Sequence, residues 1–269
     1  MARLAGKRAV VLGAAGRGNM GQAIARRYAS EGARVLVAGR REEPLRELAE
    51  AIGGEWALCD ITRRAEVQAL TDTARQRLSG VDVAVNATGW GLLKPLLEVT
   101  EDDLERVVAL QFKGVHHFLQ AFVGAMLEGG GSIIQISSAT TRVPIADHAA
   151  YIGTKAGSEA LIRCIANEYG AHGIRANVVS PGLTESPMTV QSLQVPGLVD
   201  AFLAKYPMGR LNTSADIAAA CVWLASDECF VTGENLQVNG GLTLRGNPQG
   251  HEVQASIGAA MAKLGAAAP

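Results

Sequence analysis

The chain has 269 residues and a net charge of −1; 48% of its residues are hydrophobic and 19% are charged. This length suits one large α/β domain or two small ones, and the near-neutral charge offers no field that would attract nucleic acid or an anionic membrane. No apolar run approaches the roughly 20 residues that span a bilayer, and the N-terminal segment lacks the apolar core of a secretory signal. We therefore expect a cytoplasmic protein without a nucleic-acid or membrane partner.

The cysteine and histidine residues do not follow the spacing of a metal site. The four cysteines (Cys59, Cys164, Cys221 and Cys229) are scattered, and the five histidines show no HExxH pattern. Isolated thiols of this kind are typical of buried cysteines in a reducing compartment. The sequence predicts no metal ligands.

Short β-branched runs alternate with longer helical patterns along most of the chain. The predicted strands are 8–12, 33–38, 55–59, 81–85, 132–136, 175–179 and 235–238, and the predicted helices are 22–31, 42–52, 64–78, 101–127, 148–172, one near 198, and 214–224. Continuously apolar strands indicate a sheet covered on both faces, and repeated strand–helix–strand units favour parallel strands. The predicted fold is α/β: a Rossmann-like, doubly wound parallel sheet of about seven strands with helices on both faces.

No linker divides this pattern, so residues 1–245 are predicted to form a single domain. Residues 246–269 are rich in Gly and Ala and fall outside the strand–helix alternation. They are either a tail or a C-terminal extension that docks on a neighbouring subunit.

The first predicted strand runs into a glycine-rich turn, Gly13-Ala14-Ala15-Gly16-Arg17-Gly18-Asn19-Met20-Gly21, and a helix follows it. Small residues let the backbone approach a pyrophosphate, and the start of a helix favours negative charge. The turn stands at the strand-to-helix junction that this mechanism needs. We expect a dinucleotide cofactor to bind here.

The second predicted strand ends in Arg40 and Arg41, with Arg17 nearby. A site selective for NAD usually offers a carboxylate at this place, whereas guanidinium groups suit the 2′-phosphate of NADP. The sequence predicts NADP(H) rather than NAD(H). Solvated surface charge is the alternative interpretation of these arginines.

Tyr151 and Lys155 are one helical turn apart, which places a phenol and an ammonium group on one helix face. A nearby positive charge favours the phenolate and lowers the pKa of a tyrosine, so the pair is a candidate proton-transfer device. Ser138 could add a hydrogen bond to a substrate oxygen.

Taken together, these motifs resemble the short-chain dehydrogenase/reductase family over roughly residues 4–245. Further segments match in order: Cys59-Asp60-Ile61, Val85-Asn86-Ala87-Thr88-Gly89, Ser137-Ser138, Ser180-Pro181-Gly182, Ala225-Ser226-Asp227 and Val238-Asn239-Gly240-Gly241. The resemblance implies that Tyr151 is the general acid or base, that Lys155 lowers its pKa and holds the nicotinamide ribose, and that Ser138 binds the substrate oxygen.

The resemblance also implies a set of cofactor contacts: Gly13, Arg17, Asn19, Met20, Gly21, Arg40, Arg41, Asp60, Ile61, Asn86, Ala87, Tyr151, Lys155, Pro181, Gly182 and Thr184. Members of the family are often tetramers, so a homo-oligomer, either a tetramer or a dimer, is expected.

The chain departs from the family pattern at two places. The glycine turn is two residues longer than usual, with Asn19 at the position of the middle glycine, and Gln111 stands where a catalytic Asn is expected. The longer turn also resembles the enoyl-thioester reductase branch, which spaces its Tyr and Lys more widely than here. Gln111 carries the same polar group as Asn on one more methylene, and it either serves the proton relay or alters it.

The leading hypothesis is an NADP-dependent interconversion of a ketone and a secondary alcohol. The expected substrate walls are Trp90, Leu92, residues 139–148 and residues 183–206; they are mostly apolar, with His148 either facing the pocket or lying on the surface. Enoyl-thioester reduction and a dinucleotide-binding sensor without turnover are the alternatives.

Overall fold

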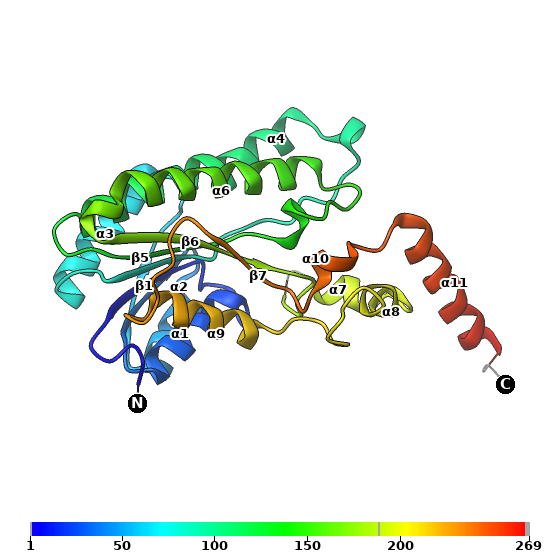
Figure 1. Cartoon of the computed structure of the whole chain (residues 1–269), viewed down its shortest axis with the longest axis horizontal. Helices are drawn as coiled ribbons and strands as arrows, with labels where there is room; N and C mark the ends of the chain where they lie inside the picture. Colours follow the sequence, from blue (N-terminus) through cyan, green and yellow to red (C-terminus); the bar gives the residue numbers. More distant parts are fainter. Residues whose placement is uncertain (1, 188, 267–269) are drawn as a thin grey trace.

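The computed structural model describes residues 2–187 and 189–266 (Figure 1). The other residues lie outside these ranges. Met1 belongs to the predicted domain, Met188 to the predicted substrate wall, and residues 267–269 to the predicted extension.

The described residues build one parallel sheet of seven strands in the order β3-β2-β1-β4-β5-β6-β7. The strands are β1 (Arg8–Leu12), β2 (Arg34–Gly39), β3 (Glu55–Leu58), β4 (Val83–Asn86), β5 (Gly131–Ile136), β6 (Ile174–Pro181) and β7 (Asn235–Val238). This confirms the predicted doubly wound parallel sheet. The strand order reverses between β1 and β4, and that is where such sheets bind ligands.

The strands are buried on both faces because helices cover both. The covering helices of one face are α1 (Met20–Ser30), α2 (Glu42–Ile52) and α9 (Ser214–Ala225), which pack on Ala9 and Val11 of β1. Val10 and Leu12 point to the other face, where they meet α3 (Arg64–Leu78), α5 (Gly114–Met126) and α6 (Ala149–Tyr169) (Figure 1). Alternate side chains of one strand therefore anchor two separate cores.

The remaining helical segments lie in connections and at the C-terminal end. They are η1 (Leu96–Glu98), α4 (Glu101–Val108), η2 (Ala109–Lys113), η3 (Ala139–Thr141), η4 (Gly170–His172), α7 (Val190–Leu193), α8 (Leu198–Leu203), α10 (Leu242–Arg245) and α11 (Gly250–Ala266). Of the helices in residues 2–187 and 189–266, none is both long and apolar enough to cross a bilayer.

The predicted helix 101–127 is interrupted in the structure. Residues Ala109–Lys113 form a π-helical turn between α4 and α5, and Gln111 is at its centre. Wider turns of this kind insert an extra residue into a helix and frequently mark functional sites. Within this turn Gln111 is buried, and its Nε2 donates to the hydroxyl of Thr154 on α6 at 3.0 Å.

The Gly/Ala-rich extension is largely helical. Its helix α11 packs on α8, where Ser256 Oγ donates to the Gly197 carbonyl at 2.8 Å and Lys205 pairs with Glu252 at 2.7 Å. Figure 1 shows α11 projecting from the body of the molecule.

Candidate active site

A cavity of about 570 Å³ opens at the carboxyl ends of β1 to β5. Its lining residues are Gly13, Ala15, Gly16, Asn19, Met20, Gly39, Arg40, Arg41, Cys59, Asp60, Ile61, Ala87, Thr88, Gly89, Leu110, Ile136, Ser137, Tyr151, Lys155, Ser186 and Pro187. The glycine turn, the two arginines and the Tyr–Lys pair therefore share one cavity, although they come from distant parts of the sequence.

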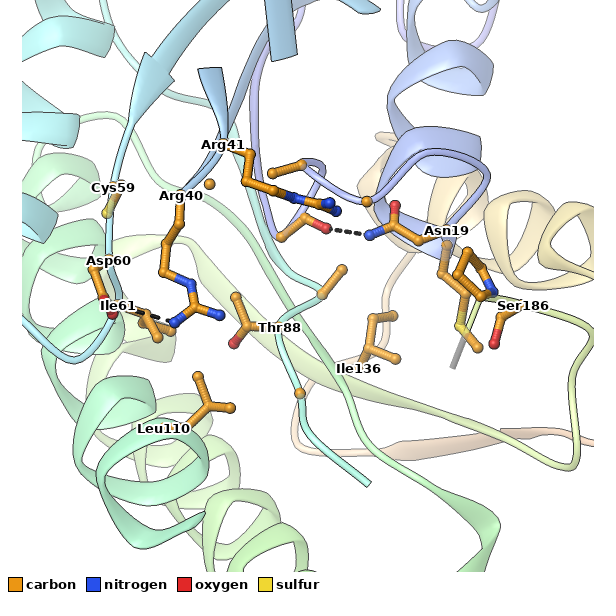
Figure 2. Close-up of a pocket in the computed structure, with 18 of the residues that line it drawn as sticks. Asn19, Arg40, Arg41, Cys59, Asp60, Ile61, Thr88, Leu110, Ile136 and Ser186 are labelled. Atoms are coloured by element: carbon orange, nitrogen blue, oxygen red, sulfur yellow. Dashed lines mark hydrogen bonds and ion pairs between the residues drawn. The ribbon is translucent and has the colours of Figure 1, made fainter. Parts of the chain in front are cut away.

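Asn19 shapes the end of the glycine turn. Its Oδ1 accepts the Gln22 backbone N–H at 2.9 Å, which caps α1, and its Nδ2 donates to the Gly13 carbonyl at 2.8 Å (Figure 2). The first turn of α1 contains no acidic residue. The helix start thus faces the cavity with its positive dipole end uncompensated, which suits an anion.

Gly13 lets β1 and β4 meet under the cavity. Its φ is +101°, and a Cβ there would lie 2.6 Å from the Ala87 carbonyl carbon. A Cβ on Gly21 would lie 2.6 Å from the Gly13 carbonyl oxygen. Both positions exclude a side chain, and the backbone of the turn stays accessible as a phosphate cradle.

Arg40 and Arg41 both line the cavity beyond the end of β2 (Figure 2). Arg40 lies 3.9 Å from Asp60, and 70% of its side chain is exposed. Burial raises the pKa of Asp60, but hydrogen bonds from Thr62 and the charges of Arg40 and Arg63 outweigh it, so the pKa is lowered. Asp60 is therefore an anion that orients Arg40.

Arg17 is placed differently from the other two arginines. Its guanidinium group binds Glu47 on α2 at 2.6 Å and lies 3.7 Å from Glu43. It does not line the cavity in the described structure. Its cofactor contact stays a prediction, and making it would require Arg17 to leave Glu47.

The Tyr–Lys pair lies on the first two turns of α6. Lys155 is 3% exposed, its Nζ donates to the Ile136 carbonyl at 2.9 Å, and it lies 5.9 Å from the centre of the Tyr151 ring. Ser138 follows the end of β5 and accepts hydrogen bonds at its Oγ from the backbone N–H (3.2 Å) and hydroxyl (2.9 Å) of Thr140. The three side chains converge from two elements that are adjacent in space.

The electrostatics differ from the sequence expectation. Burial raises the pKa of Tyr151, and a hydrogen bond with Ser138 offsets this only in part. Burial also lowers the pKa of Lys155 to about 8, although the charge of Glu159 acts in the opposite direction. The pKa of Tyr151 is therefore not lowered as expected, because desolvation outweighs the hydrogen bond with Ser138.

Gln111 is buried beside this pair. Its Oε1 accepts the Trp90 backbone N–H at 3.2 Å, and its Nε2 donates to the hydroxyl of Thr154 at 3.0 Å. A Cβ on Gly89 would lie 3.4 Å from Gln111 Oε1 and 3.5 Å from Lys155 Nζ, so the glycine leaves room between these two side chains. Gln111 thus ties the loop after β4 to α6, and its part in a proton relay stays a prediction.

The remaining predicted contacts lie close to the cavity but not in its wall. Asn86 is fully buried; its Nδ2 donates to Gln135 at 2.9 Å, and its Oδ1 accepts from the backbone and hydroxyl of Thr88. The predicted residues outside the wall are Arg17, Gly21, Asn86, Gln111, Ser138, Pro181, Gly182 and Thr184. Asn86 therefore positions Thr88, which does line the cavity.

Sequence reasoning missed several wall residues, including Thr88, Leu110 and Ser137. Ser137 was signalled by its place beside Ser138 at the end of a strand. Ser186 and Pro187 come from the loop after β6, and they belong to the predicted substrate wall 183–206.

Part of the predicted substrate walls forms an apolar cluster. This cluster joins Phe202, Tyr206 and Leu242 with Val143 and Ile145. Trp90 packs under Arg106, whose guanidinium carbon lies 4.1 Å from the ring centre, and the rings of His148 and Tyr151 are 5.9 Å apart, edge to face. These contacts bring parts of the predicted substrate walls together.

Comparisons with known proteins agree with this geometry. Residues 13–243 match the family model described as "Enoyl-(Acyl carrier protein) reductase". A D-threitol dehydrogenase of Mycolicibacterium smegmatis is 34% identical, with 90% of this chain and 95% of the relative covered. The chain belongs to the short-chain dehydrogenase/reductase family. A 3β-hydroxysteroid dehydrogenase of Eggerthella lenta is also 34% identical, with the same coverage.

The fold of the family is confirmed by a solved structure. A short-chain type dehydrogenase/reductase from Mycobacterium ulcerans superposes with a TM-score of 0.86 at 26% identity, covering 90% of this chain and 91% of that one. As a member of the short-chain dehydrogenase/reductase family, the chain is an oxidoreductase that acts on CH–OH groups with NAD(H) or NADP(H). The glycine cradle and the α1 N-terminus fit the pyrophosphate of such a dinucleotide.

Proposed function

We propose that this chain interconverts a ketone and a secondary alcohol with NADP(H), and that Tyr151 is its general acid and base. One observation carries the proposal: Tyr151 and Lys155 line the same cavity as the glycine turn and the arginines Arg40 and Arg41. The bound dinucleotide would supply or accept the hydride. The protein's part is to bind, to orient and to move a proton.

Each group has a defined task in this proposal. The turn from Gly13 to Met20 holds the pyrophosphate, and Arg40 and Arg41 hold the 2′-phosphate. Ser138 donates to the substrate oxygen, and Tyr151 gives that oxygen its proton in reduction or removes it in oxidation. Lys155 holds the ribose and stabilises negative charge on the phenol oxygen.

Replacing Tyr151 by Phe tests the chemistry. The variant keeps the ring and its packing but has no proton to give, so kcat for any ketone substrate should fall by at least roughly 100-fold. The measurement is NADPH absorbance over a panel of ketones and aldehydes. Undiminished turnover in the variant refutes the role of Tyr151, and a wild-type protein that turns over none of them favours a sensor.

The cofactor preference rests on the exposed guanidinium group of Arg40. Arg40→Ala would remove a charge-assisted hydrogen bond to the 2′-phosphate. We expect kcat/KM for NADPH to fall by roughly 10- to 100-fold and kcat/KM for NADH to stay unchanged. Arg46→Ala is the matched control, because Arg46 is exposed on α2 and pairs only with Glu50 in the described structure. A wild-type preference for NADH overturns the NADP assignment.

Enoyl reduction is the second candidate, because the matching family model carries that description. The four-residue spacing of Tyr151 and Lys155 favours the carbonyl reaction. Product analysis with an enoyl thioester and a ketone as competing substrates distinguishes the two, since only C=C reduction yields a saturated thioester.

The relatives named for a polyol and a hydroxysteroid support a substrate with a secondary hydroxyl group. The apolar cluster and the hydroxysteroid relative favour an apolar or cyclic skeleton. We also propose a homo-oligomer, either a dimer or a tetramer. Leu104 on α4 and Phe112 on η2 are 42% and 38% exposed, so a subunit contact on this side would bury apolar surface. Light scattering that gives a monomer mass at micromolar concentration contradicts this.

A further inference from the structure

Three residues on one face of α6 meet the last residue of β5, Ile136, and the two residues that follow it. Tyr151, Lys155 and Glu159 are spaced four apart, so they lie in a row along the helix. Lys155 Nζ donates to the Ile136 carbonyl at 2.9 Å, Ser137 Oγ donates to Glu159 Oε1 at 2.5 Å, and Ser138 shares a hydrogen bond with Tyr151. The proposed reaction uses the first and third contacts but leaves Glu159 without a task.

The contact with Ser137 is what keeps the Glu159 carboxylate at this place. Glu159 is half-buried, and a carboxylate on such a helix face would otherwise gain more from turning toward water. Ser137 is 5% exposed, follows directly after the carbonyl that binds Lys155, and donates a hydrogen bond to the charged group. Charge-assisted hydrogen bonds are about twice as strong as neutral ones. The pair therefore holds a negative charge one helical turn from Lys155.

That charge acts on an ammonium group with no other close anion among the described residues. Lys155 meets the neutral carbonyl of Ile136 on β5, and the neutral amide of Gln111 on η2 lies across the gap beside Gly89. Within the same described ranges, Glu159 is the charged group whose field acts on Lys155, and it opposes the effect of burial.

Other titratable groups lie farther away or face Tyr151. His148 contacts the Tyr151 ring edge to face. Arg40, Arg41 and Asp60 line the cavity beyond β2 and β3, and β2 is three strands from β5, or roughly 14 Å. They cannot replace a carboxylate one turn away on the same helix.

We propose that Glu159, held by Ser137, is a positioning residue that keeps Lys155 in its ammonium form over the pH range of catalysis. The inference rests on the proposed roles of Tyr151 and Lys155 in proton transfer. It adds a third member to that system, one that touches neither substrate nor cofactor and acts through Lys155.

The sign of its effect does not depend on which of the two groups loses its proton first. Ketone reduction needs Tyr151 protonated and Lys155 charged. Removing a nearby negative charge makes deprotonation of either group easier. The loss of reductase activity at alkaline pH should therefore begin at a lower pH when Glu159 is neutral.

Glu159→Gln is the direct test, because glutamine keeps the shape and still accepts the hydrogen bond from Ser137. Glu168→Gln is the matched control: it removes the same charge from an exposed position of α6, 13 residues or roughly 20 Å beyond Lys155. Thermal melting of both variants confirms that they fold.

The primary measurement is an NMR titration of protein labelled with ¹³C at the lysine ε-carbons, with Lys155 assigned from the signal missing in Lys155→Met. We expect the Lys155 midpoint in Glu159→Gln to fall by about one pH unit below the wild type and the control. The alkaline limb of kcat/KM for ketone reduction should shift in the same direction, and Glu159→Asp should restore part of both shifts.

The two readouts separate the two proposals. A protein that reduces no ketone contradicts the proposed function, while the NMR midpoint still reports on Glu159. An unchanged Lys155 midpoint in Glu159→Gln overturns the inference, even where the ketone is reduced normally. A lower kcat with an unmoved pH profile also overturns it, because that result indicates a structural role alone.

Discussion

Gly13→Ala tests whether the floor of the cavity depends on a position that excludes every side chain. The backbone of Gly13 has a φ of +101°, which costs an L-residue roughly 1–2 kcal/mol. The new Cβ would also lie 2.6 Å from the Ala87 carbonyl carbon and 2.8 Å from the Thr88 nitrogen. These are backbone atoms that cannot rotate away, so the overpacking costs roughly another 1–3 kcal/mol. The sum is about 2–5 kcal/mol.

Each kcal/mol shifts the Tm of a domain of this size by roughly 2–4 °C, so Gly13→Ala should melt about 4–20 °C below the wild type. Gly18→Ala separates the two contributions, because Gly18 also has a positive φ (+72°) but no atom within 4 Å of the place that a Cβ would take. It should lose only the conformational part, about 1–2 kcal/mol.

Circular dichroism melts of the two variants at equal concentration measure the difference. Because Ala87 and Thr88 line the cavity and must move, Gly13→Ala should also bind NADPH more weakly than Gly18→Ala in a calorimetric titration. Equal melting temperatures for the two variants refute the steric argument.

Two further predictions concern titratable groups. A hydrogen bond from Lys94 at 2.6 Å and the capping box with Thr100 lower the pKa of Asp103 to about 2. The folded value lies below the unfolded value of about 3.9, so the ionised carboxylate stabilises the fold above about pH 4 and this contribution fades as the pH falls toward 2. Asp103→Asn should therefore lower the Tm at pH 7 and match the wild type increasingly closely from pH 5 to pH 3; a constant difference contradicts this. Burial raises the pKa of the cavity thiol of Cys59 to about 12, so at pH 8 roughly one thiol in 10,000 is ionised, and iodoacetamide should leave Cys59 unlabelled by mass spectrometry until urea is added.

The positions of the inner strands could be predicted because these strands are buried on both faces. β1 and β4, for example, consist mostly of consecutive apolar residues, as expected of strands with a helix layer on each face. The break at Gln111 could not be predicted in this way. Its side chain bonds to Trp90 and Thr154, which are distant in sequence, and helical periodicity contains no trace of such contacts. The helix α11 was missed because its Gly- and Ala-rich composition suggests a tail, although Val253, Ile257, Met261 and Leu264 are spaced as one helix face.

The site residues could be predicted where a short sequence motif determines the local backbone geometry. The glycine turn and the Tyr151–Lys155 spacing specify local backbone and helix-face relations, and both line the cavity. Arg17 shows the limit of this reasoning, because its partner Glu47 comes from the next helix of the fold. The sequence also did not reveal how deeply Tyr151 is buried. This burial decides the direction of the Tyr151 pKa, which the spacing alone predicts with the opposite sign.

That sign bears on which direction of the reaction the site favours. Burial keeps Tyr151 protonated, and Lys155, with a pKa of about 8, is mostly charged at pH 7. The pair therefore holds the proton that carbonyl reduction consumes, whereas alcohol oxidation must first remove it. We expect kcat/KM for reduction to be constant up to about pH 8 and to fall above it. Over that alkaline range kcat/KM for oxidation should rise. His148, next to the Tyr151 ring, is the competing base. If His148 served as the base, His148→Asn would lower kcat/KM for oxidation without changing the profile for reduction.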